Sequence, residues 1–86
     1  MKLDTRTQEL IAIGASFTAH CQPCLEHHVG KARQMGIDPE EISDAIEVAK
    51  MVRKGAAAAL DTFVASKILL IPAAPAEAQA GCGCSS

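Results

Sequence analysis

The sequence predicts an all-α fold. Apolar residues recur at three- and four-residue intervals through most of the first 70 positions, and residues that start or end helices separate these periodic stretches. Neither the alternation typical of strands nor an internal repeat is found among the 86 residues. A chain of this length can form one domain, since domains usually have about 100 to 150 residues. We therefore expect one helical domain at 1–71 and a flexible tail at 72–86.

The first expected helix covers about residues 5–20. Asp4 can cap its start, and one face carries apolar residues: Leu10, Ile11, Ile13 and Phe17. Gly14 is a weak point in its interior. A second helix should begin within the Cys-Gln-Pro-Cys segment, where Pro23 lacks only an N–H that would be unpaired in a first turn, and end at Gly36.

The third expected helix has the clearest start in the chain. In Asp-Pro-Glu-Glu, Asp38 is the N-cap, Pro39 takes the first helical position, and an acidic residue follows that can reach back to the cap. The buried stripe of this helix is Ile42, Ala45, Ile46, Ala49 and either Val52 or Arg53. Gly55 interrupts the helical pattern of apolar residues, so that 56–70 forms either a fourth helix or a kinked continuation of the third. From Pro72 onward the chain is rich in Pro, Ala and Gly, which predicts the tail.

Composition excludes several classes of function. A formal net charge of −2 and the presence of only two aromatic residues, both Phe, argue against nucleic-acid binding. The sequence has neither an apolar run of the roughly 18 residues that span a membrane nor a signal-peptide pattern, which predicts a cytoplasmic protein. Hydrophobic residues make up 49% of the chain, more than one small core can bury, which predicts a homo-oligomer.

Nine residues, from His20 to His28, contain two thiols and three imidazoles. Cysteines three residues apart at the start of a helix can form a disulfide, and the positive end of the helix favours the thiolate. His28 lies one helical turn beyond Cys24 and can take its proton, with His27 as the competing base. If the first two helices pack antiparallel, the Glu9 carboxylate could reach His28 and orient the imidazole.

Other readings of the same residues remain open. The CxxC and a histidine could form half of a zinc site, completed by Cys82 and Cys84, although a flexible tail and CxC spacing are less usual in a closed tetrahedral site. A c-type haem requires His directly after the second cysteine, where this chain has Leu25. Inert buried thiols are the remaining alternative. No cofactor is expected.

The spacing Glu9, Cys21, Cys24, His28 resembles that of the AhpD-like, carboxymuconolactone decarboxylase family. The segment 36–53 is similar to the turn and helix that follow the CxxC helix in that family, so that the resemblance spans about residues 3–70. It implies an AhpD-like helical domain that assembles into trimers or hexamers. It also implies a thiol-dependent peroxidase or disulfide reductase that uses a hydroperoxide or disulfide substrate and a thiol reductant.

The resemblance also implies a role for each residue of the motif. Cys24 attacks the peroxide, Cys21 resolves the product as a disulfide, His28 is the base, and Glu9 is the outer member of a proton relay. The decarboxylase branch of the family lacks the CxxC, which argues against lactone decarboxylation here.

Two features depart from the pattern of the best-known members of the family. Pro23 stands where those members have a histidine before the second cysteine, which favours thiol–disulfide exchange as the activity. The tail adds Cys82 and Cys84, a tethered dithiol that could exchange with the CxxC disulfide or bind a thiophilic metal ion or metalloid.

Overall fold

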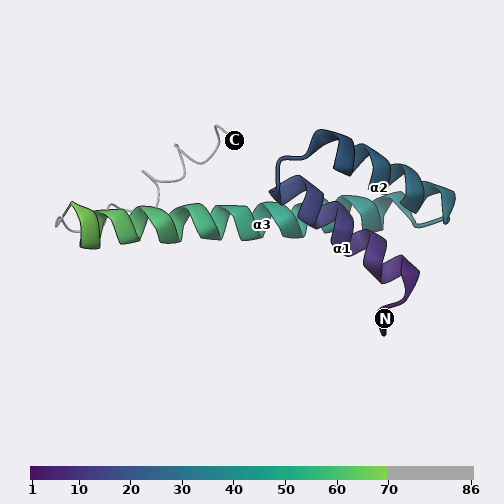
Figure 1. Ribbon diagram of the computed structural model, residues 1–86, viewed down its shortest axis with the longest axis horizontal. Coiled ribbons are helices and arrows are strands. Elements are labelled where there is room, and N and C mark those ends of the chain that lie inside the picture. Colours follow the sequence, from purple (N-terminus) through teal and green to yellow (C-terminus); the bar gives the residue numbers. More distant parts are fainter. Residues whose placement is uncertain (70–86) are drawn as a thin grey trace. The chain divides into compact units, whose positions relative to one another are not determined.

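A computed structural model describes residues 1–69, and every regular element in that range is helical. Three α-helices follow one another: α1 (Thr5–Thr18), α2 (Gln22–Gln34) and α3 (Pro39–Phe63). A π-helical turn, Val64–Ile68, comes directly after α3. The chain divides into two compact units, of which residues 1–50 form the first. α1, α2 and the first half of α3 belong to this unit (Figure 1).

Side chains that the sequence marks as caps start the helices. The Asp4 carboxylate accepts the N–H of Thr7 at 2.8 Å at the start of α1. At the start of α3, the Asp38 carboxylate accepts the N–H of Glu40 at 3.0 Å. These bonds satisfy N–H groups that have no partner within the helix, so the predicted starts of the first and third helices are confirmed.

α1 and α2 end in the same way. The residue two positions after each helix has a positive φ: 59° for His20 and 79° for Gly36. The N–H of the next residue then reaches back five positions, from Cys21 to Ser16 and from Ile37 to Ala32, at 3.1 and 3.0 Å. This is the Schellman arrangement, which usually has glycine at the left-handed position. Because His20 turns the chain there, α1 stops at Thr18 and not at residue 20 as expected.

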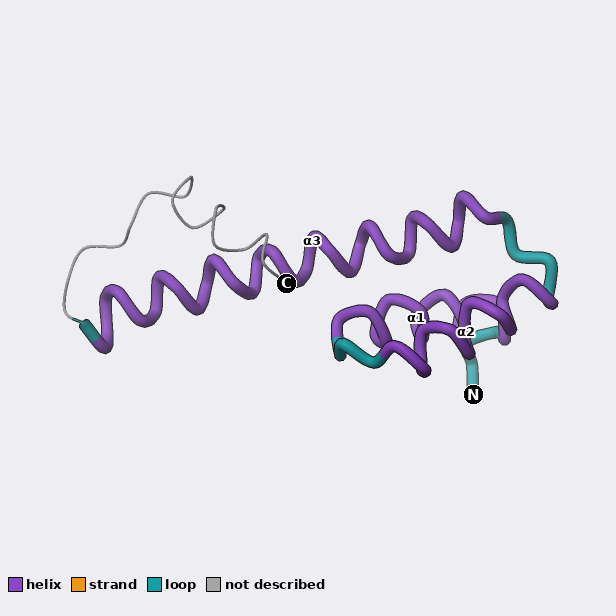
Figure 2. The backbone as a smooth tube through the Cα atoms, turned by 90° about the horizontal axis from the view of Figure 1, so that it is seen from above, coloured by secondary structure: helices purple, strands orange, loops and turns teal. Residues whose placement is uncertain are grey.

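The core of the first unit lies where its helices meet. α2 packs back along α1, and both views show the two helices side by side (Figures 1 and 2). Four buried residues form the centre of this core: Ile13, Ala32, Ile37 and Ile42. The expected stripe on α3 contributes Ile42 and Ala49 as buried residues, with Ala45 and Ile46 partly buried beside them. The antiparallel packing of the first two helices is the arrangement that the Glu9–His28 contact requires.

The sequence left two alternatives open at Gly55, a fourth helix or a kinked continuation of the third. α3 passes through this residue without interruption, so 56–63 is the continuation of the third helix and not a fourth one. One glycine costs a helix about 1 kcal/mol relative to alanine, and the four alanines that follow are the best helix formers. None of the helices within residues 1–69 is long and apolar enough to cross a membrane. The expected tail at 72–86, with Cys82 and Cys84, lies outside the described residues.

Candidate functional site

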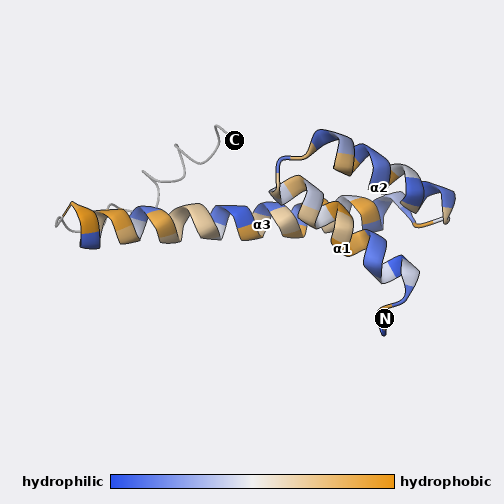
Figure 3. Cartoon of the chain, in the orientation of Figure 1, coloured by the Kyte–Doolittle hydropathy of each residue, from blue (hydrophilic) through white to orange (hydrophobic). Residues whose placement is uncertain are grey.

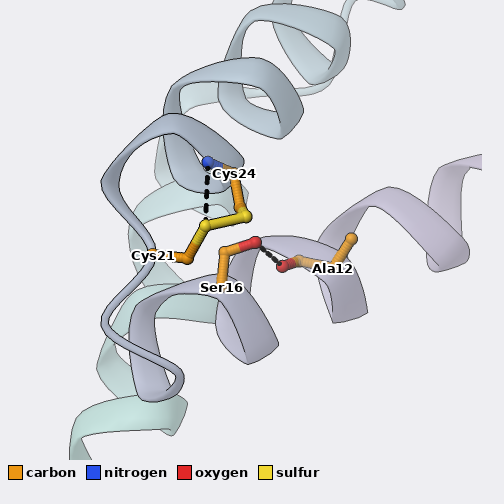
Figure 4. The surroundings of a disulfide bond; sticks show 4 residues. All are labelled: Ala12, Ser16, Cys21 and Cys24. Atoms are coloured by element: carbon orange, nitrogen blue, oxygen red, sulfur yellow. Dashed lines mark hydrogen bonds between the residues drawn. A yellow bond between two sulfur atoms is a disulfide. The ribbon is translucent and has the colours of Figure 1, made fainter.

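Cys21 and Cys24 form a disulfide at the first turn of α2, with their Cα atoms 5.2 Å apart (Figure 4). Cys21 is the N-cap of α2, and its Sγ accepts the N–H of Cys24 at 3.3 Å. Pro23 lies in the first turn, as predicted. Cys24 is exposed and Cys21 is partly buried. The sulfur that is held by the helix N-terminus is therefore Cys21, whereas Cys24 is the more accessible of the two residues.

Glu9 and His28 form a hydrogen-bonded pair between α1 and α2. The carboxylate of Glu9 is nearly buried, with 5% of the residue exposed, and its Oε1 lies 2.8 Å from Nδ1 of His28. An ionised carboxylate can only accept a hydrogen bond, so Nδ1 of the imidazole is the nitrogen that carries the proton. In neutral His28, Nε2 is then left as a proton acceptor. The contact that the sequence suggested between these two residues is present.

Lys31 holds the other oxygen of the Glu9 carboxylate, with its Nζ 3.5 Å from Oε2. The hydrogen bond from His28 is the main cause that lowers the pKa of Glu9, and the positive charge of Lys31 adds to it. Burial acts in the opposite direction and raises this pKa, but the net shift is downward. Glu9 is therefore held as a carboxylate, the form that fixes the tautomer of His28.

Ser16 brings a buried hydroxyl group to the surroundings of the disulfide (Figure 4). Its Oγ donates to the carbonyl of Ala12 at 2.7 Å, and its own carbonyl accepts the N–H of Cys21. Glu9 and Ser16 are the buried polar residues of the part that the structure describes. Ser16 thus links the end of α1 directly to the first cysteine.

The other two histidines are exposed. The ring of His27 meets that of His28 edge to face, with 4.9 Å between the centroids, but it is His28 that bonds to Glu9. His20 occupies the turn between α1 and α2. Within residues 1–69, His, Cys, Asp and Glu side chains do not gather in groups of three or more that could hold a metal ion.

Two residues of the site were missed by the sequence analysis. Lys31 could have been found from its spacing, because it follows His28 by three positions and therefore lies on the same face of α2. Ser16 follows Glu9 by seven positions, which places both on the buried face of α1 together with Ile13. Serine is common near helix ends for several reasons, so this spacing alone did not indicate that Ser16 belongs to the site. The packing of α2 on α1 was needed to show it.

The sequence of the chain is similar to those of known proteins. The chain is 46% identical over 55 residues to "Uncharacterized protein 4 in cox locus" of Paracoccus denitrificans, an alignment that covers 64% of this chain and 50% of the relative. The chain thus spans about half the length of the curated relative that it matches. No solved structure matches it significantly. Residues 1–65, most of the 86, match the Carboxymuconolactone decarboxylase family, and the chain therefore belongs to that family.

Proposed function

We propose that the protein is a thiol-dependent oxidoreductase that cycles between the Cys21–Cys24 disulfide and the dithiol while it reduces a hydroperoxide or a partner disulfide. The observation that carries this proposal is the CxxC disulfide at the start of α2 together with His28, which lies one turn further along that helix and is hydrogen-bonded to the nearly buried Glu9 carboxylate of α1. A redox pair needs a base that can take and return protons, and an oriented imidazole suits this task near neutral pH.

The proposed peroxidase reaction has two steps. His28 takes the proton of Cys24, and the thiolate attacks a peroxide oxygen, which breaks the O–O bond, forms a sulfenic acid and releases an alcohol after proton return. Cys21 then attacks this sulfur, so that the disulfide forms and water leaves. The exposure of Cys24 supports its role as the attacking thiol, and the N–H bond to Cys21 supports a resolving thiol that is easily deprotonated.

The cycle closes when a dithiol donor reduces the disulfide. One donor thiolate attacks a sulfur of the Cys21–Cys24 bond, and the second donor thiol then displaces the protein from the mixed disulfide. The two electrons come from the donor, which becomes a disulfide. With a protein disulfide as substrate the same exchange runs in the opposite direction, and Pro23 in the CxxC is consistent with that activity.

The test uses the reduced full-length chain with cumene hydroperoxide and dihydrolipoamide, thioredoxin or glutathione as alternative donors. We expect peroxide-dependent donor oxidation that is abolished by Cys24→Ser. Cys21→Ser should instead stop after one turnover, with a trapped sulfenic acid on Cys24 detectable by dimedone. His28→Ala should slow the reaction about 100-fold, the range typical of general bases, and His27→Ala, its matched control, should not.

Other outcomes would contradict the proposal. If the dithiol neither reduces peroxide nor exchanges with the disulfide of insulin, the oxidoreductase function is wrong. If the purified protein instead holds zinc that protects its cysteines from alkylation, the thiols are metal ligands, as the alternative reading of the sequence has it.

The cysteines of the C-terminal segment suggest an addition to this cycle. On sequence grounds we propose that Cys82 and Cys84 exchange with the Cys21–Cys24 disulfide and carry electrons to it. A chain that ends after Ala80 should then be reduced more slowly by at least one donor. Equal rates for the truncated and the full-length chain with every donor would refute the relay.

A further inference from the structure

The Ser16 hydroxyl lies in the surroundings of the Cys21–Cys24 disulfide (Figure 4), although its hydrogen bond is made within α1. The residue is 7% exposed. Its Oγ donates to the carbonyl of Ala12, four residues earlier. Ala12 lies inside α1, where its carbonyl is also the ladder partner of the N–H of Ser16. Rotation of the hydroxyl away from Ala12 therefore leaves no carbonyl unpaired.

The disulfide and the dithiol differ in what they offer to such a donor. The sulfurs of a disulfide are neutral and weak acceptors, so a carbonyl oxygen is the better partner in the oxidised state. Reduction by a dithiol donor breaks the S–S bond and transfers two electrons to the cysteines, while the donor becomes a disulfide. One donor proton stays on one cysteine, which becomes a thiol, and the other goes to solvent, so that the second cysteine is a thiolate. The thiolate is charged, and hydrogen bonds to charged acceptors are about twice as strong as those between neutral groups.

We propose that Ser16 stabilises the reduced form of the redox pair: when the Cys21–Cys24 disulfide opens, the Oγ–H turns from Ala12 to the adjacent cysteine sulfur and donates a hydrogen bond to the thiolate. The inference rests on the proposed function for its use, but the hydrogen bond itself needs no substrate. It gives this pair a second donor, from α1, in addition to the N–H of Cys24 in α2.

A substitution at Ser16 leaves the charged and titratable groups on all three helices of the first unit unchanged. On α1, Glu9 is already held by His28 and Lys31, both from α2. From α3 of the same unit, Glu41 is paired with Arg6. Glu26 and His27 on α2 are exposed, as is His20 before Cys21. Removal of the Ser16 hydroxyl therefore changes one hydrogen bond near the sulfurs without altering the charge of the site.

The test compares Ser16→Ala with Thr18→Ala in the full-length chain. Thr18 is a matched control, since its Oγ1 also donates to the carbonyl four residues earlier, at 3.0 Å, but it is exposed. The pKa of the reactive thiol is measured from the pH dependence of iodoacetamide alkylation. The reduction potential is measured by equilibration with glutathione, above that pKa.

Loss of the hydrogen bond should raise the thiol pKa of Ser16→Ala by about one unit, the order expected for a bond to a charged group. The equilibrium constant for reduction should fall about tenfold, which for a two-electron couple makes the potential about 30 mV more negative. Thr18→Ala should leave both quantities at the wild-type values.

A second pair of variants separates the hydrogen bond from packing. Ser16→Thr and Ser16→Val have nearly the same shape, and only the first keeps a hydroxyl. We expect Ser16→Thr to have the lower thiol pKa and the less negative potential of the two. If Ser16→Ala folds poorly, the comparison of Ser16→Thr with Ser16→Val still tests the proposal.

The inference is wrong if Ser16→Ala keeps the wild-type thiol pKa and potential, or if Thr and Val at this position give equal values. It is also wrong if Thr18→Ala shifts both quantities as much as Ser16→Ala does. The thiol pKa and the reduction potential are both measured without a peroxide or a partner disulfide. A protein without oxidoreductase activity would therefore refute the proposed function, while these two measurements would still decide whether Ser16 stabilises the thiolate.

Discussion

Glu9 occupies a nearly buried position as a carboxylate, because Nδ1 of His28 and Nζ of Lys31 each contact one of its oxygens. A carboxyl group with a lowered pKa stabilises the folded state at pH values above its ordinary pKa, which is about 4.5 for Glu9. That contribution is lost as the pH falls through the lowered folded value. The pH dependence of stability therefore reports on this pair.

We expect Glu9→Gln to be less stable than the wild type at pH 7, because the charged acceptor is gone. The difference in the free energy of unfolding should shrink as the pH falls below about 4.5 towards the lowered pKa of Glu9. Urea denaturation of the oxidised proteins between pH 7 and pH 2.5 measures this. Glu26→Gln, an exposed glutamate on α2, is the control and should give a small difference. A constant difference between wild type and Glu9→Gln at all pH values would contradict the assignment.

His20 and Gly36 take the same left-handed backbone conformation after α1 and α2, but only His20 has a Cβ. A left-handed backbone costs a residue with a Cβ about 1 kcal/mol relative to glycine. We expect His20→Gly to raise the free energy of unfolding by up to about this amount, and Gly36→Ala to lower it by a similar amount. A Cβ at Gly36 would meet no atom within 4 Å, so any loss there comes from the backbone alone. Calorimetry of both variants, with the disulfide intact, checks the pair.

At the scale of elements, the sequence predicts the helix starts better than the interruptions. Asp4 and Asp38 could be recognised because a cap is a local feature, set by residues within one turn. The Glu9–His28 contact could be named from the CxxC spacing and an assumed antiparallel pairing, but it depended on packing that no local pattern fixes. The effect of Gly55 stayed undecided, because a glycine has the same appearance in a sequence whether it ends a helix or lies within one.

Gly14 and Gly55, both inside helices, should therefore respond differently to substitution. A Cβ on Gly55 would meet nothing within 4 Å, so Gly55→Ala should stabilise the protein by about 1 kcal/mol through helix propensity. A Cβ on Gly14 would lie 3.4 Å from the carbonyl oxygen of Ala45 and 3.8 Å from the Cβ of Ala49, where α1 crosses α3. Alanine fits there, but Gly14→Leu would force the helices apart.

Thermal unfolding followed by circular dichroism at 222 nm measures these effects. We expect Gly14→Leu to lose about 1 to 3 kcal/mol, the usual cost of overpacking. A Gly14→Leu protein as stable as the wild type would show that α1 does not approach α3 as described. A less stable Gly55→Ala would show that α3 is interrupted at residue 55.

At the scale of the whole molecule, the described part of the second unit, residues 51–69, leaves large apolar side chains exposed in the single chain. Met51, Val52, Leu60 and Phe63 are between 51% and 70% exposed, and Figure 3 shows hydrophobic residues along much of the C-terminal part of α3. Large exposed apolar surfaces are rare on monomeric proteins and usually mark sites of protein–protein contact. We propose that further copies of the chain cover it in a homo-oligomer, a trimer or hexamer.

Replacement of Leu60 and Phe63 by glutamate should dissociate this assembly. Burial of one such side chain stabilises an interface by about 1.5 to 3 kcal/mol, so the double variant should lose several kcal/mol per subunit. Size-exclusion chromatography with light scattering should show the wild type as a multiple of 9.0 kDa and the variant as a smaller species. Thr62→Glu, an exposed polar position between them, is the control and should keep the wild-type mass. A wild type that remains at the mass of one chain at micromolar concentrations would refute the oligomer. A variant that keeps the full mass would place the interface on another surface.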